Sequence, residues 1–342
     1  MKKITKIVCT LGPASDKLEI LSKMKEAGMD IARINMSHGS RESAQHLIDE
    51  IATLREKQDL KLLIDTKGPE IRIGTFENGS IILNEGDKFV MTSKNVVGSQ
   101  KMVGLKYKQL VEEVKVGDKI FANNGLIVLQ VVSLSKTQIV CKVLFGGKLS
   151  NNKSLNVPGV VPSTPFLSEV DKQDLLFAIE NKADFVALSF VSTRQNVLDV
   201  KEFLNANGGQ NIKIIAKIEN AKGVENAESI LDECDGLMVA RGDLGVEIPL
   251  EKIPPVQKKL ISLCNVKRKF CIVATEMLES MTNSTRPTRA EVSDVATAIY
   301  EEANATMLSG ETSVGIDPVL VVQTMSKIIA EIEKHIYETK II

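Results

Sequence analysis

The sequence contains no tryptophan, few aromatic residues and no excess of either charge. Aromatic residues make up 4% of the 342 residues, and the 43 basic side chains are balanced by 44 acidic ones, for a formal net charge of -1. A surface that stacks nucleic-acid bases needs exposed aromatic rings, and binding to nucleic acid or an anionic membrane needs a basic field. The composition therefore argues against nucleic acid and membranes as partners.

Cysteine pairs and long apolar runs are also lacking. The five cysteines show no CxxC spacing and are odd in number, so we expect reduced, buried thiols rather than a disulfide framework or a zinc site. No apolar run is long enough to cross a bilayer, and the apolar part of the first residues, MKKITKIVCTLGPAS, is too short for a secretory signal. These absences predict a cytoplasmic protein.

The chain does contain a regular alternation of strand-like and helix-like segments. Between residues 4 and 67, β-branched runs such as KIVCTL and IARIN alternate with helical runs such as LEILSKMKEAGM. The alternation resumes after residue 163 and continues to a long final helix, VLVVQTMSKIIAEIEKHIYETK. Strand–helix alternation of this kind predicts parallel strands.

Residues from about 71 to 160 follow another pattern, in which short alternating runs are separated by Asn-Gly, Gly-Asp and Gly-Gly turn signals. Outside them lie eight predicted strands, each followed by a helix except at this insertion. Eight such units favour a closed barrel over an open doubly wound sheet, and neither a GxGxxG nor a GxxxxGK[ST] loop is present. We therefore predict an α/β fold, a (β/α)8 TIM barrel of residues 1–68 and 163–342, with an all-β lid domain of residues 69–162 inserted after the third strand.

In barrel enzymes the reactive groups lie at the C-terminal ends of the strands. Reading off these ends collects one polar set: Arg33, Asn35, Ser37, His38, Asp65, Thr66, Lys67, Arg72, Lys217, Glu219, Arg241, Asp243, Thr275, Glu276, Ser309 and Glu311. Charged residues at a single strand end are ordinary. Four in two consecutive strand–helix units, at Lys217, Glu219, Arg241 and Asp243, indicate a metal-assisted active site.

The set sorts into three chemical groups. Glu219 and Asp243 are hard oxygen donors for Mg²⁺ or Mn²⁺. Arg33, Arg72 and Lys217 supply positive charge for a phosphate or carboxylate. The third group consists of oxygen donors suited to a weakly held monovalent cation: Asn35, Ser37, Asp65 and Thr66. Together the groups predict phosphoryl transfer without a Walker loop, in which Lys217 meets charge that develops on the phosphoryl group or on an enolate.

Eight segments, in order, resemble the successive motifs of the pyruvate kinase family: KIVCTLGPAS, RINMSHG, DTKGPEIR, IAKIEN, MVARGDLGVEIP, ATEMLESM, RPTRAEVSDVA and MLSGETSVG. They cover the barrel from end to end, and the β insertion falls where that family carries its lid domain. The resemblance implies phosphoryl transfer from phosphoenolpyruvate to ADP, giving pyruvate and ATP in glycolysis. It also implies Mg²⁺ (or Mn²⁺) and K⁺ as cofactors.

Matched motif by motif, the resemblance implies roles for individual residues. The divalent-metal positions are Glu219 and Asp243, the K⁺ positions are Asn35, Ser37, Asp65 and Thr66, and the loop around the substrate carboxylate is Ala240, Arg241 and Gly242. Catalytic roles fall to Lys217, Arg33, Arg72 and Thr275, and nucleotide contacts fall to Asn35, His38 and Arg72. Thr275 falls near the carbon that is protonated and also counts among the substrate-binding positions. With Glu70, the chain is similar at this position to the K⁺-dependent forms of the family, since a lysine there goes with K⁺ independence.

Departures from the family pattern stand beside these matches. Met36 replaces a usual Phe, Glu276 replaces a usual Gln, and Asn123-Asn124 replaces a usual Asp-Asp pair on the nucleotide side of the lid. The chain ends at Ile342, where the family continues into a further domain, so we expect that regulatory domain to be absent. We also expect a homodimer through the barrel helices around residues 289–301, with little activation by phosphorylated sugars.

Two other functions stay open at this point. One is a Mg²⁺-dependent aldolase or lyase that acts through a pyruvate enolate on a similar barrel, although such an enzyme needs no lid to close over a nucleotide. The other is a catalytically inactive relative that binds or regulates, motivated by Glu276, the lid asparagines and the missing domain. Against it, both metal carboxylates and the lysine of the catalytic set are present.

Overall fold

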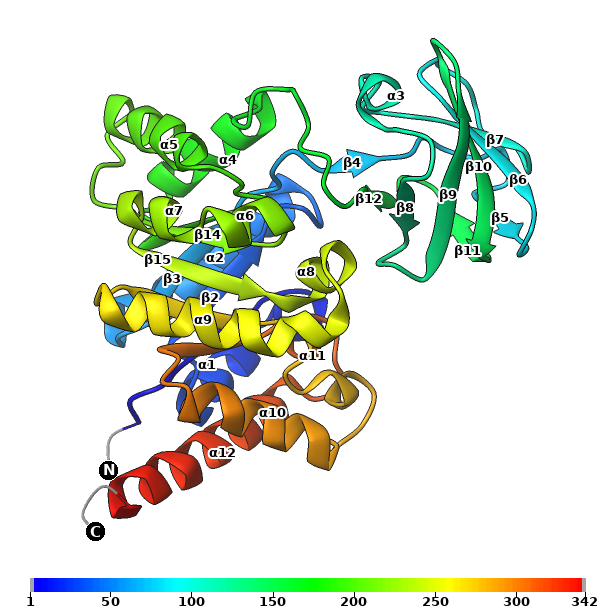
Figure 1. The fold of residues 1–342 in the computed structure, drawn as a ribbon. Coiled ribbons are helices and arrows are strands. Elements are labelled where there is room, and N and C mark those ends of the chain that lie inside the picture. The colour runs from blue at the N-terminus through cyan, green and yellow to red at the C-terminus, as the bar shows by residue number, and fades with distance from the viewer. Residues whose placement is uncertain (1–2, 340–342) are drawn as a thin grey trace.

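A computed structural model describes residues 3–339 and contains a closed barrel of eight parallel strands (Figure 1). The barrel strands are β1 (Lys6–Thr10), β2 (Ile31–Asn35), β3 (Lys61–Asp65), β13 (Phe185–Leu188), β14 (Lys213–Ile218), β15 (Gly236–Ala240), β16 (Phe270–Ala274) and β17 (Ala305–Leu308). The last strand pairs in parallel with the first, with Ala305 opposite Lys6, and this closes the sheet. Each strand coincides with a run read as a strand in the sequence, and the predicted barrel is confirmed.

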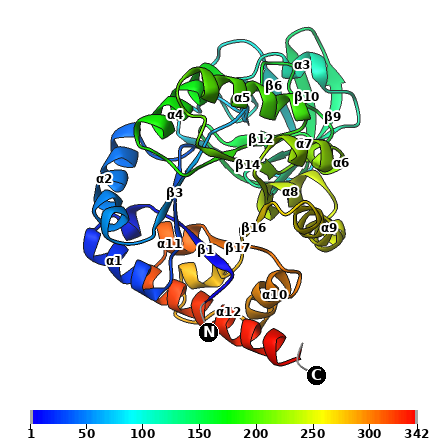
Figure 2. The same cartoon turned by 90° about the vertical axis from the view of Figure 1, so that its left-hand side faces the viewer.

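Helices follow the strands and surround the barrel (Figures 1 and 2). They are α1 (Leu18–Ala27), α2 (Arg41–Lys57), α4 (Glu169–Glu180), α5 (Arg194–Ala206), α6 (Ala221–Glu225), α7 (Ala227–Glu233), α8 (Arg241–Glu247), α9 (Ile253–Val266), α10 (Arg289–Tyr300), α11 (Gly310–Ser313) and α12 (Pro318–Thr339). Short 3₁₀ turns lie at Pro13–Ser15, Leu250–Lys252 and Glu279–Thr282. Several helices begin at a serine or threonine whose side chain accepts a backbone N–H, which stabilises the first turn.

The interior of the barrel is filled by side chains, so it is a packed core and not a channel. This inner core consists of Val8, Ile31, Leu63, Ala187, Ile215, Met238, Ile272, Ala274, Ala305 and Met307. A larger core lies between the outer faces of the strands and the helices. The polar side chains at the strand ends therefore rest on close-packed layers on both sides of the sheet, which hold them in fixed positions.

Between β3 and α4 the chain leaves the barrel and forms a separate lobe, the lid (Figure 1). Its elements are β4 (Ile71–Arg72), β5 (Ser80–Leu83), β6 (Lys88–Thr92), β7 (Met102–Gly104), α3 (Leu110–Glu113), β8 (Lys119–Ala122), β9 (Ile127–Leu134), β10 (Gln138–Phe145), β11 (Gly147–Ser150) and β12 (Ser154–Asn156). Seven of these strands form one sheet in the order β4-β12-β8-β9-β10-β6-β7, and β5 pairs with β11. The lobe has a hydrophobic core of its own, and its helix α3 is a single turn.

At the N-terminal end of the barrel, four polar residues form what we call the basal ring: Asp30, Asp184, Asp235 and Asn304. Each of them precedes a barrel strand, and its side chain accepts the first or second backbone N–H of the strand before it, at 2.8 to 2.9 Å. The backbone carbonyl oxygen of each ring residue accepts the first N–H of the strand on the other side, from Lys61, Lys213, Phe270 and Lys6 respectively, at 2.9 to 3.1 Å. The ring thus satisfies backbone donors that the sheet leaves open at this end.

The two ends of the described chain are tied together by one buried carboxylate. Glu333 of α12 is 8% exposed, and its Oε1 accepts the backbone N–H groups of Ile4 at 3.1 Å and Thr5 at 2.6 Å. Figures 1 and 2 show the N-terminal segment beside this last helix. The contact fixes the start of β1 and so contributes to closure of the barrel.

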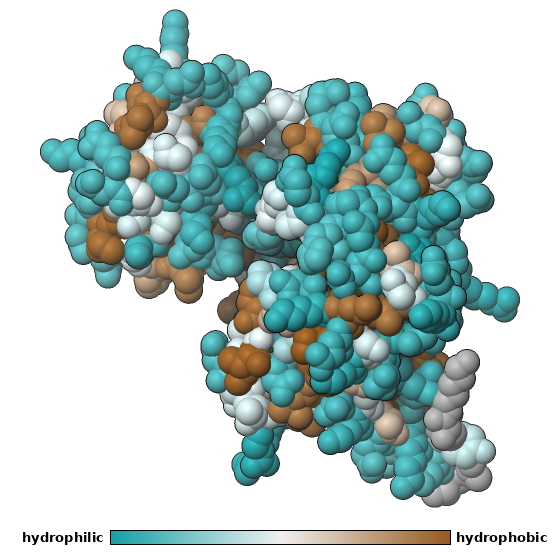
Figure 3. Space-filling view, turned by 180° about the vertical axis from the view of Figure 1, so that it is seen from behind, coloured by the Kyte–Doolittle hydropathy of each residue, from teal (hydrophilic) through white to brown (hydrophobic). Residues whose placement is uncertain are grey.

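The surface is mostly hydrophilic, with scattered apolar side chains, and a notch separates the lid from the barrel (Figure 3). The five cysteines are buried and form no disulfide, as the sequence analysis expects. Among residues 3–339, no helix combines the length and the apolar character needed to cross a membrane.

The basal ring yields a first prediction. Replacement of Asp235 by Ala removes the acceptor of the Ile214 N–H, and we expect the free energy of unfolding to fall by about 1–2 kcal/mol, because one hydrogen bond to a partly exposed charged group is lost. Asp235→Asn should cost much less, since Asn304 performs the same task with an amide oxygen. Urea unfolding of the two variants tests this, and equal losses would show that charge rather than hydrogen bonding matters here.

Candidate active site

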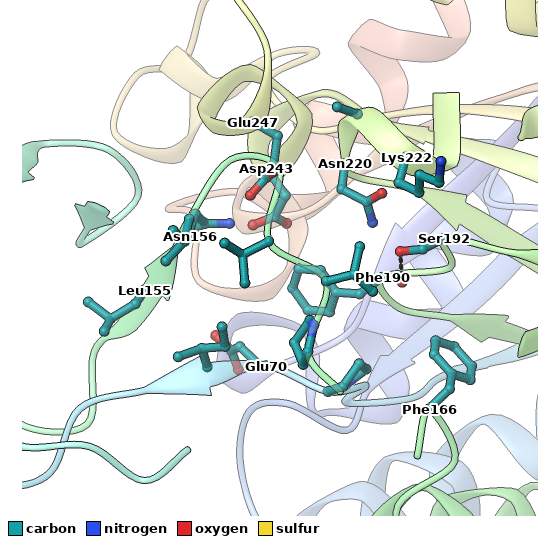
Figure 4. A pocket seen from close by; sticks show the side chains of 18 of the residues that line it. Glu70, Leu155, Asn156, Phe166, Phe190, Ser192, Asn220, Lys222, Asp243 and Glu247 are labelled. Atoms are coloured by element: carbon teal, nitrogen blue, oxygen red, sulfur yellow. Dashed lines mark hydrogen bonds between the residues drawn. The ribbon is translucent and has the colours of Figure 1, made fainter. Parts of the chain in front are cut away.

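A cavity lies between the lid and the segments of the barrel that follow strands β13, β14 and β15 (Figure 4). On the lid side it is lined by the segments around Pro69–Ile71 and Ser154–Val157, and on the barrel side by Phe190, Asp243 and Glu247, among others. Both chain connections between lid and barrel therefore border the cavity, and a change in lid orientation alters its shape.

A buried carboxylate, Asp65 at the end of β3, holds two cationic side chains together. Nε and Nη2 of Arg33 lie 2.8 and 2.7 Å from Oδ2 of Asp65, and Nζ of Lys217 lies 3.1 Å from Oδ1. Asp65 is 0% exposed, Arg33 6% and Lys217 8%. The sequence analysis selected all three, and the barrel brings them into direct contact from three different strands.

Two hydroxyl groups that the sequence analysis did not select complete this network. Oγ1 of Thr10 accepts a 2.7 Å hydrogen bond from Nη1 of Arg33. Oγ of Ser189 accepts one of 2.7 Å from Nζ of Lys217 and donates to the carbonyl of Thr66 at 2.8 Å. Thr10 ends the first barrel strand and Ser189 directly follows the fourth, so the rule that located the other residues applies to these two as well.

The charges in this network stabilise one another against burial. Burial disfavours the ionised form of Asp65, but the Lys217 and Arg33 charges outweigh it, so the pKa of the Asp65 carboxyl lies below its usual range. Burial also disfavours the charged form of Lys217, yet the carboxylates of Asp65 and Glu219 raise its pKa above the usual value. Lys217 is therefore an ammonium ion at neutral pH, held by these two carboxylates.

Two further carboxylates lie beside this network, and their electrostatics differ from that of Asp65. Oε2 of Glu219 accepts the Phe190 N–H at 2.7 Å, and Oε1 lies 2.9 Å from Nζ of Lys217. Burial, with a further contribution from the nearby Asp243 charge, raises the pKa of Glu219 to about 7 despite the opposing effect of Lys217. Burial likewise raises the pKa of Asp243. Both groups would be stabilised by an additional cation.

The donor chemistry of this pair fits a divalent ion. The part of the chain between residues 3 and 339 brings no three His, Cys, Asp or Glu side chains together as a metal site, so Glu219 and Asp243 would be the only protein carboxylates of the site. Mg²⁺ commonly takes one or two carboxylates and completes its shell with water and substrate oxygens. A site of two carboxylates, of which Asp243 lines the cavity, matches that preference.

The loop after β16 carries unusual backbone strain. Thr275 and Glu276 have φ of 70° and 55°, which is rare for residues other than glycine and most costly for a β-branched side chain. Oγ1 of Thr275 accepts the Gly242 N–H at 2.8 Å, and this joins the loop to the start of α8 beside Ala240. Strain that is maintained by such contacts is typical of functional loops.

Arg241 contacts this loop and is not among the residues that line the cavity. Its Nη2 donates to the Thr275 carbonyl at 2.6 Å, and its Nη1 lies 2.7 Å from the carboxylate of Asp294. Ala240, Arg241 and Gly242, the predicted substrate loop, therefore lie beside the Thr275 loop, and the Arg241 guanidinium is occupied by these partners.

The predicted monovalent-cation ligands lie at the ends of two paired strands. Asn35 and Asp65 are direct partners in the register of β2 and β3, and Thr66 follows at once. Oδ1 of Asn35 accepts the Ser37 N–H at 3.0 Å, which turns the chain after β2. These residues are neighbours in the sheet, and a carboxylate, an amide and hydroxyls are ligands that a hard cation accepts.

The structure keeps Arg72 and His38 apart from the buried network. Nε and Nη2 of Arg72 lie 2.7 and 2.6 Å from Oε2 of Glu70, and Nη1 donates to the Asn152 carbonyl at 2.8 Å. Partial burial lowers the pKa of the His38 imidazole, and the nearby Arg72 charge lowers it further. Arg72 therefore belongs to the lid connection in this conformation, while Arg33 belongs to the barrel.

A contact between lid and barrel was not expected from the sequence. The side chains of Asp243, Glu247 and Asn156 converge at the upper side of the cavity (Figure 4). Burial, and then the Asp243 charge, raises the pKa of Glu247 to about 7, while hydrogen bonds from the Asn156 side chain and the Gly159 N–H act in the opposite direction. Glu247 of α8 is therefore bound to the returning segment of the lid.

The four residues that depart from the family pattern have defined surroundings. Met36 packs against the main core, as an apolar replacement for Phe would. Glu276 is exposed. Burial raises the pKa of the nearby Glu279, and the charge of Glu276 contributes to this rise together with other carboxylates. Asn123 and Asn124 have φ of 53° and 56° in the turn between β8 and β9, a conformation that Asn tolerates well.

Comparison with known proteins agrees with this geometry. Residues 2–322 match the family profile described as "Pyruvate kinase, barrel domain". The chain is 48% identical to a pyruvate kinase of Geobacillus stearothermophilus over 98% of this chain and 58% of that protein, and 43% identical to one of Clostridium perfringens over 97% and 71%. A crystal structure of a pyruvate kinase from Cryptosporidium parvum superposes with a TM-score of 0.92 at 40% identity and covers 97% of this chain and 70% of that one.

This chain spans about 58% of the length of the first of these relatives, so the match concerns the barrel and its insertion rather than the whole of that protein. Within that span, the profile match and the superposition both include the closed barrel and the inserted β lobe. The chain belongs to the pyruvate kinase family.

Proposed function

We propose that this chain transfers the phosphoryl group of phosphoenolpyruvate to ADP and yields pyruvate and ATP. The observation that carries the proposal is the buried ammonium of Lys217, which Asp65, Glu219 and Ser189 hold close to Asp243, a residue that lines the cavity between lid and barrel. Phosphoryl transfer needs fixed positive charge around the migrating group, and this ammonium supplies it.

In the proposed reaction, the bond between phosphorus and the enol oxygen breaks while a β-phosphate oxygen of ADP bonds to phosphorus. The electron pair of the broken bond stays on the enolate oxygen, and the enolate then gains a proton at its terminal carbon to give pyruvate. Lys217 and Arg33 stabilise negative charge on the phosphoryl group and the enolate. Thr275, held by Arg241 and by its bond to Gly242, lies in the loop proposed to orient the substrate carboxylate and the carbon that is protonated.

Cations complete the proposed site. Glu219 and Asp243 would hold Mg²⁺ or Mn²⁺, which supplies positive charge to substrate oxygens and lowers the repulsion between the two anionic reactants. Asn35, Ser37, Asp65 and Thr66 would hold K⁺. Arg72 would reach a phosphate only after its pair with Glu70 opens, and we propose that it contacts the nucleotide together with His38 and Asn35.

We further propose that residues 69–162 act as a lid domain over a catalytic barrel of residues 1–68 and 163–342. An enolate–phosphate site that stays open to water would lose phosphoryl groups to hydrolysis, and a closing lobe prevents this. We also propose a homodimer through the barrel. The exposed side chains of Val292 and Tyr300 on α10 offer an apolar surface for such a contact, and a two-fold dimer needs only this one patch.

The function is tested with the purified chain, phosphoenolpyruvate, ADP, Mg²⁺ and K⁺. We expect pyruvate and ATP in equal amounts, and Lys217→Met should lower kcat by about two to three orders of magnitude with little change in the KM for phosphoenolpyruvate, because the ammonium acts in the transition state. Pyruvate formation without ADP would point to a lyase instead. No turnover in the unmodified chain would favour an inactive relative.

A second prediction concerns the divalent ion. Asp243→Asn removes one of the two carboxylates, so we expect weaker Mn²⁺ binding, measured by electron paramagnetic resonance, and a loss of turnover of at least about a hundredfold. Asp294→Asn serves as the control, since it changes a nearby carboxylate that pairs with Arg241 behind the loop. Unchanged Mn²⁺ affinity in Asp243→Asn would remove Asp243 from the metal site.

A third prediction concerns the monovalent ion. With Glu70 paired to Arg72, we expect activity to require K⁺ or NH₄⁺. Glu70→Lys should restore activity without these ions, since a lysine places a permanent positive charge beside the same site. Initial rates in tetramethylammonium buffer compare the two proteins, and full activity of the unmodified chain in that buffer would contradict the assignment.

A further inference from the structure

Two chain segments connect the lid to the barrel, and both pass the first turn of α4. The outgoing segment runs from Thr66 to Glu70, directly after β3. The returning segment runs from Val157 to Ser168, the residue that caps α4. Any rotation of the lid must be taken up in these two segments, since they are its only covalent connections to the barrel.

Three backbone N–H groups of the outgoing segment have a defined acceptor. The Thr66 N–H donates to the Ala187 carbonyl at 2.9 Å, and the Glu70 N–H donates to the Gly68 carbonyl at 2.9 Å. Between them, the Gly68 N–H donates to Oδ1 of Asp171 at 2.8 Å. Pro69 has no N–H. A carboxylate of α4 therefore holds the middle of this segment.

The returning segment is held by the same group. Oδ2 of Asp171 accepts the Ser168 N–H at 3.2 Å and the Ser168 hydroxyl, and the Asp171 N–H donates back to that hydroxyl at 3.1 Å. The Asp171 carboxylate thus forms a hydrogen bond to the outgoing segment with Oδ1 and to the returning segment with Oδ2.

A contact through Gly68 links this grip to the catalytic lysine. Gly68 has a φ of +71°, and a Cβ placed there would lie 2.8 Å from Cβ of Ser189 and 2.9 Å from its carbonyl oxygen. Ser189 is the hydroxyl that accepts the hydrogen bond from Lys217. A shift of Gly68 is therefore transmitted through a close-packed contact to the partner of Lys217.

Helix capping alone does not explain a buried charge at this position. The same kind of capping box has Ser43 in α2, Asn196 in α5 and Glu291 in α10 at this position, and Glu291 is less buried than Asp171. Asp171 is 3% exposed, so this carboxylate is withdrawn from water where neutral or less buried side chains cap the other helices. Hydrogen bonds from backbone N–H groups to a carboxylate are stronger than those to neutral acceptors, which suits a fixed pivot.

We propose that Asp171 is a positioning residue that fixes both connections of the lid and so sets the orientation in which the lid closes over the nucleotide. The proposal rests on the proposed function only for its effect on turnover. Its effect on the orientation of the lid is measurable whether or not the chain is a kinase.

The test compares Asp171→Asn and Asp171→Ala with Asp235→Ala. The last variant also removes a carboxylate that accepts a strand N–H, but at the opposite end of the barrel. Asparagine keeps an oxygen for Gly68 but presents an amide N–H to the Ser168 N–H, so it loses the returning grip and is the variant to use if alanine prevents folding. The measurements are amide hydrogen exchange of the cavity segments 154–160 and 243–247 and the kinetic constants for both substrates.

We expect both Asp171 variants to exchange faster than Asp235→Ala in the cavity segments, because the Glu247 contact with Asn156 and Gly159 opens more often. We also expect the KM for ADP to rise about tenfold, while the KM for phosphoenolpyruvate, whose site lies on the barrel, changes less than about threefold. Exchange equal to that of the control would overturn the proposal. Faster exchange with no ADP effect in an active enzyme would also overturn it, since the pivot would then not position the nucleotide. Faster exchange in a chain without kinase activity would uphold the pivot and reject the proposed function.

Discussion

The buried carboxylate of Asp65 is the constraint on which the site depends. A charge that is 0% exposed persists only when opposite charges and hydrogen-bond donors surround it, and Arg33 and Lys217 meet that need. Each of these cations then needs a further acceptor, which Thr10 and Ser189 supply. The network fixes the direction of the Lys217 ammonium before any substrate arrives, and such preorganisation is what electrostatic catalysis requires.

The sequence was sufficient to predict the barrel because each strand is a short β-branched run and each helix has its own periodicity and cap. It was also sufficient to predict that Arg33, Asp65, Lys217 and Glu219 gather, since parallel strands end on one side of a barrel. Single threonines and serines at strand ends are too common to stand out, so Thr10 and Ser189 were not predicted. Their role is visible only from their tertiary contacts.

The side-chain directions of two arginines could not be predicted for a related reason. Arg241 and Arg72 lie in motifs that point to anion binding, yet each is paired with a carboxylate in this structure, Asp294 and Glu70. Motif spacing places a Cα atom near a site, whereas the long arginine side chain chooses among all acceptors within its reach. The hydrogen bond from the Gly68 N–H to Asp171 could not be predicted for the same reason, because a capping box in the sequence does not show which distant N–H the second carboxylate oxygen accepts.

The basal ring bears on how a barrel tolerates a domain-sized insertion. The lid is inserted between β3 and β13, and Asp184 ties the starts of these two strands together, with its side chain on Leu62 and its own N–H on the Leu62 carbonyl. The ends of the inserted chain are thus brought together by contacts that do not involve the lid, and the entropy cost of a longer loop grows only with the logarithm of its length. The same bond pattern occurs at Asp30, Asp235 and Asn304, so the barrel consists of four two-strand modules, each closed at its base. A loop between the two strands of a module can therefore be lengthened at the C-terminal end of the strands without breaking the contacts of the basal ring. The lid is one such insertion.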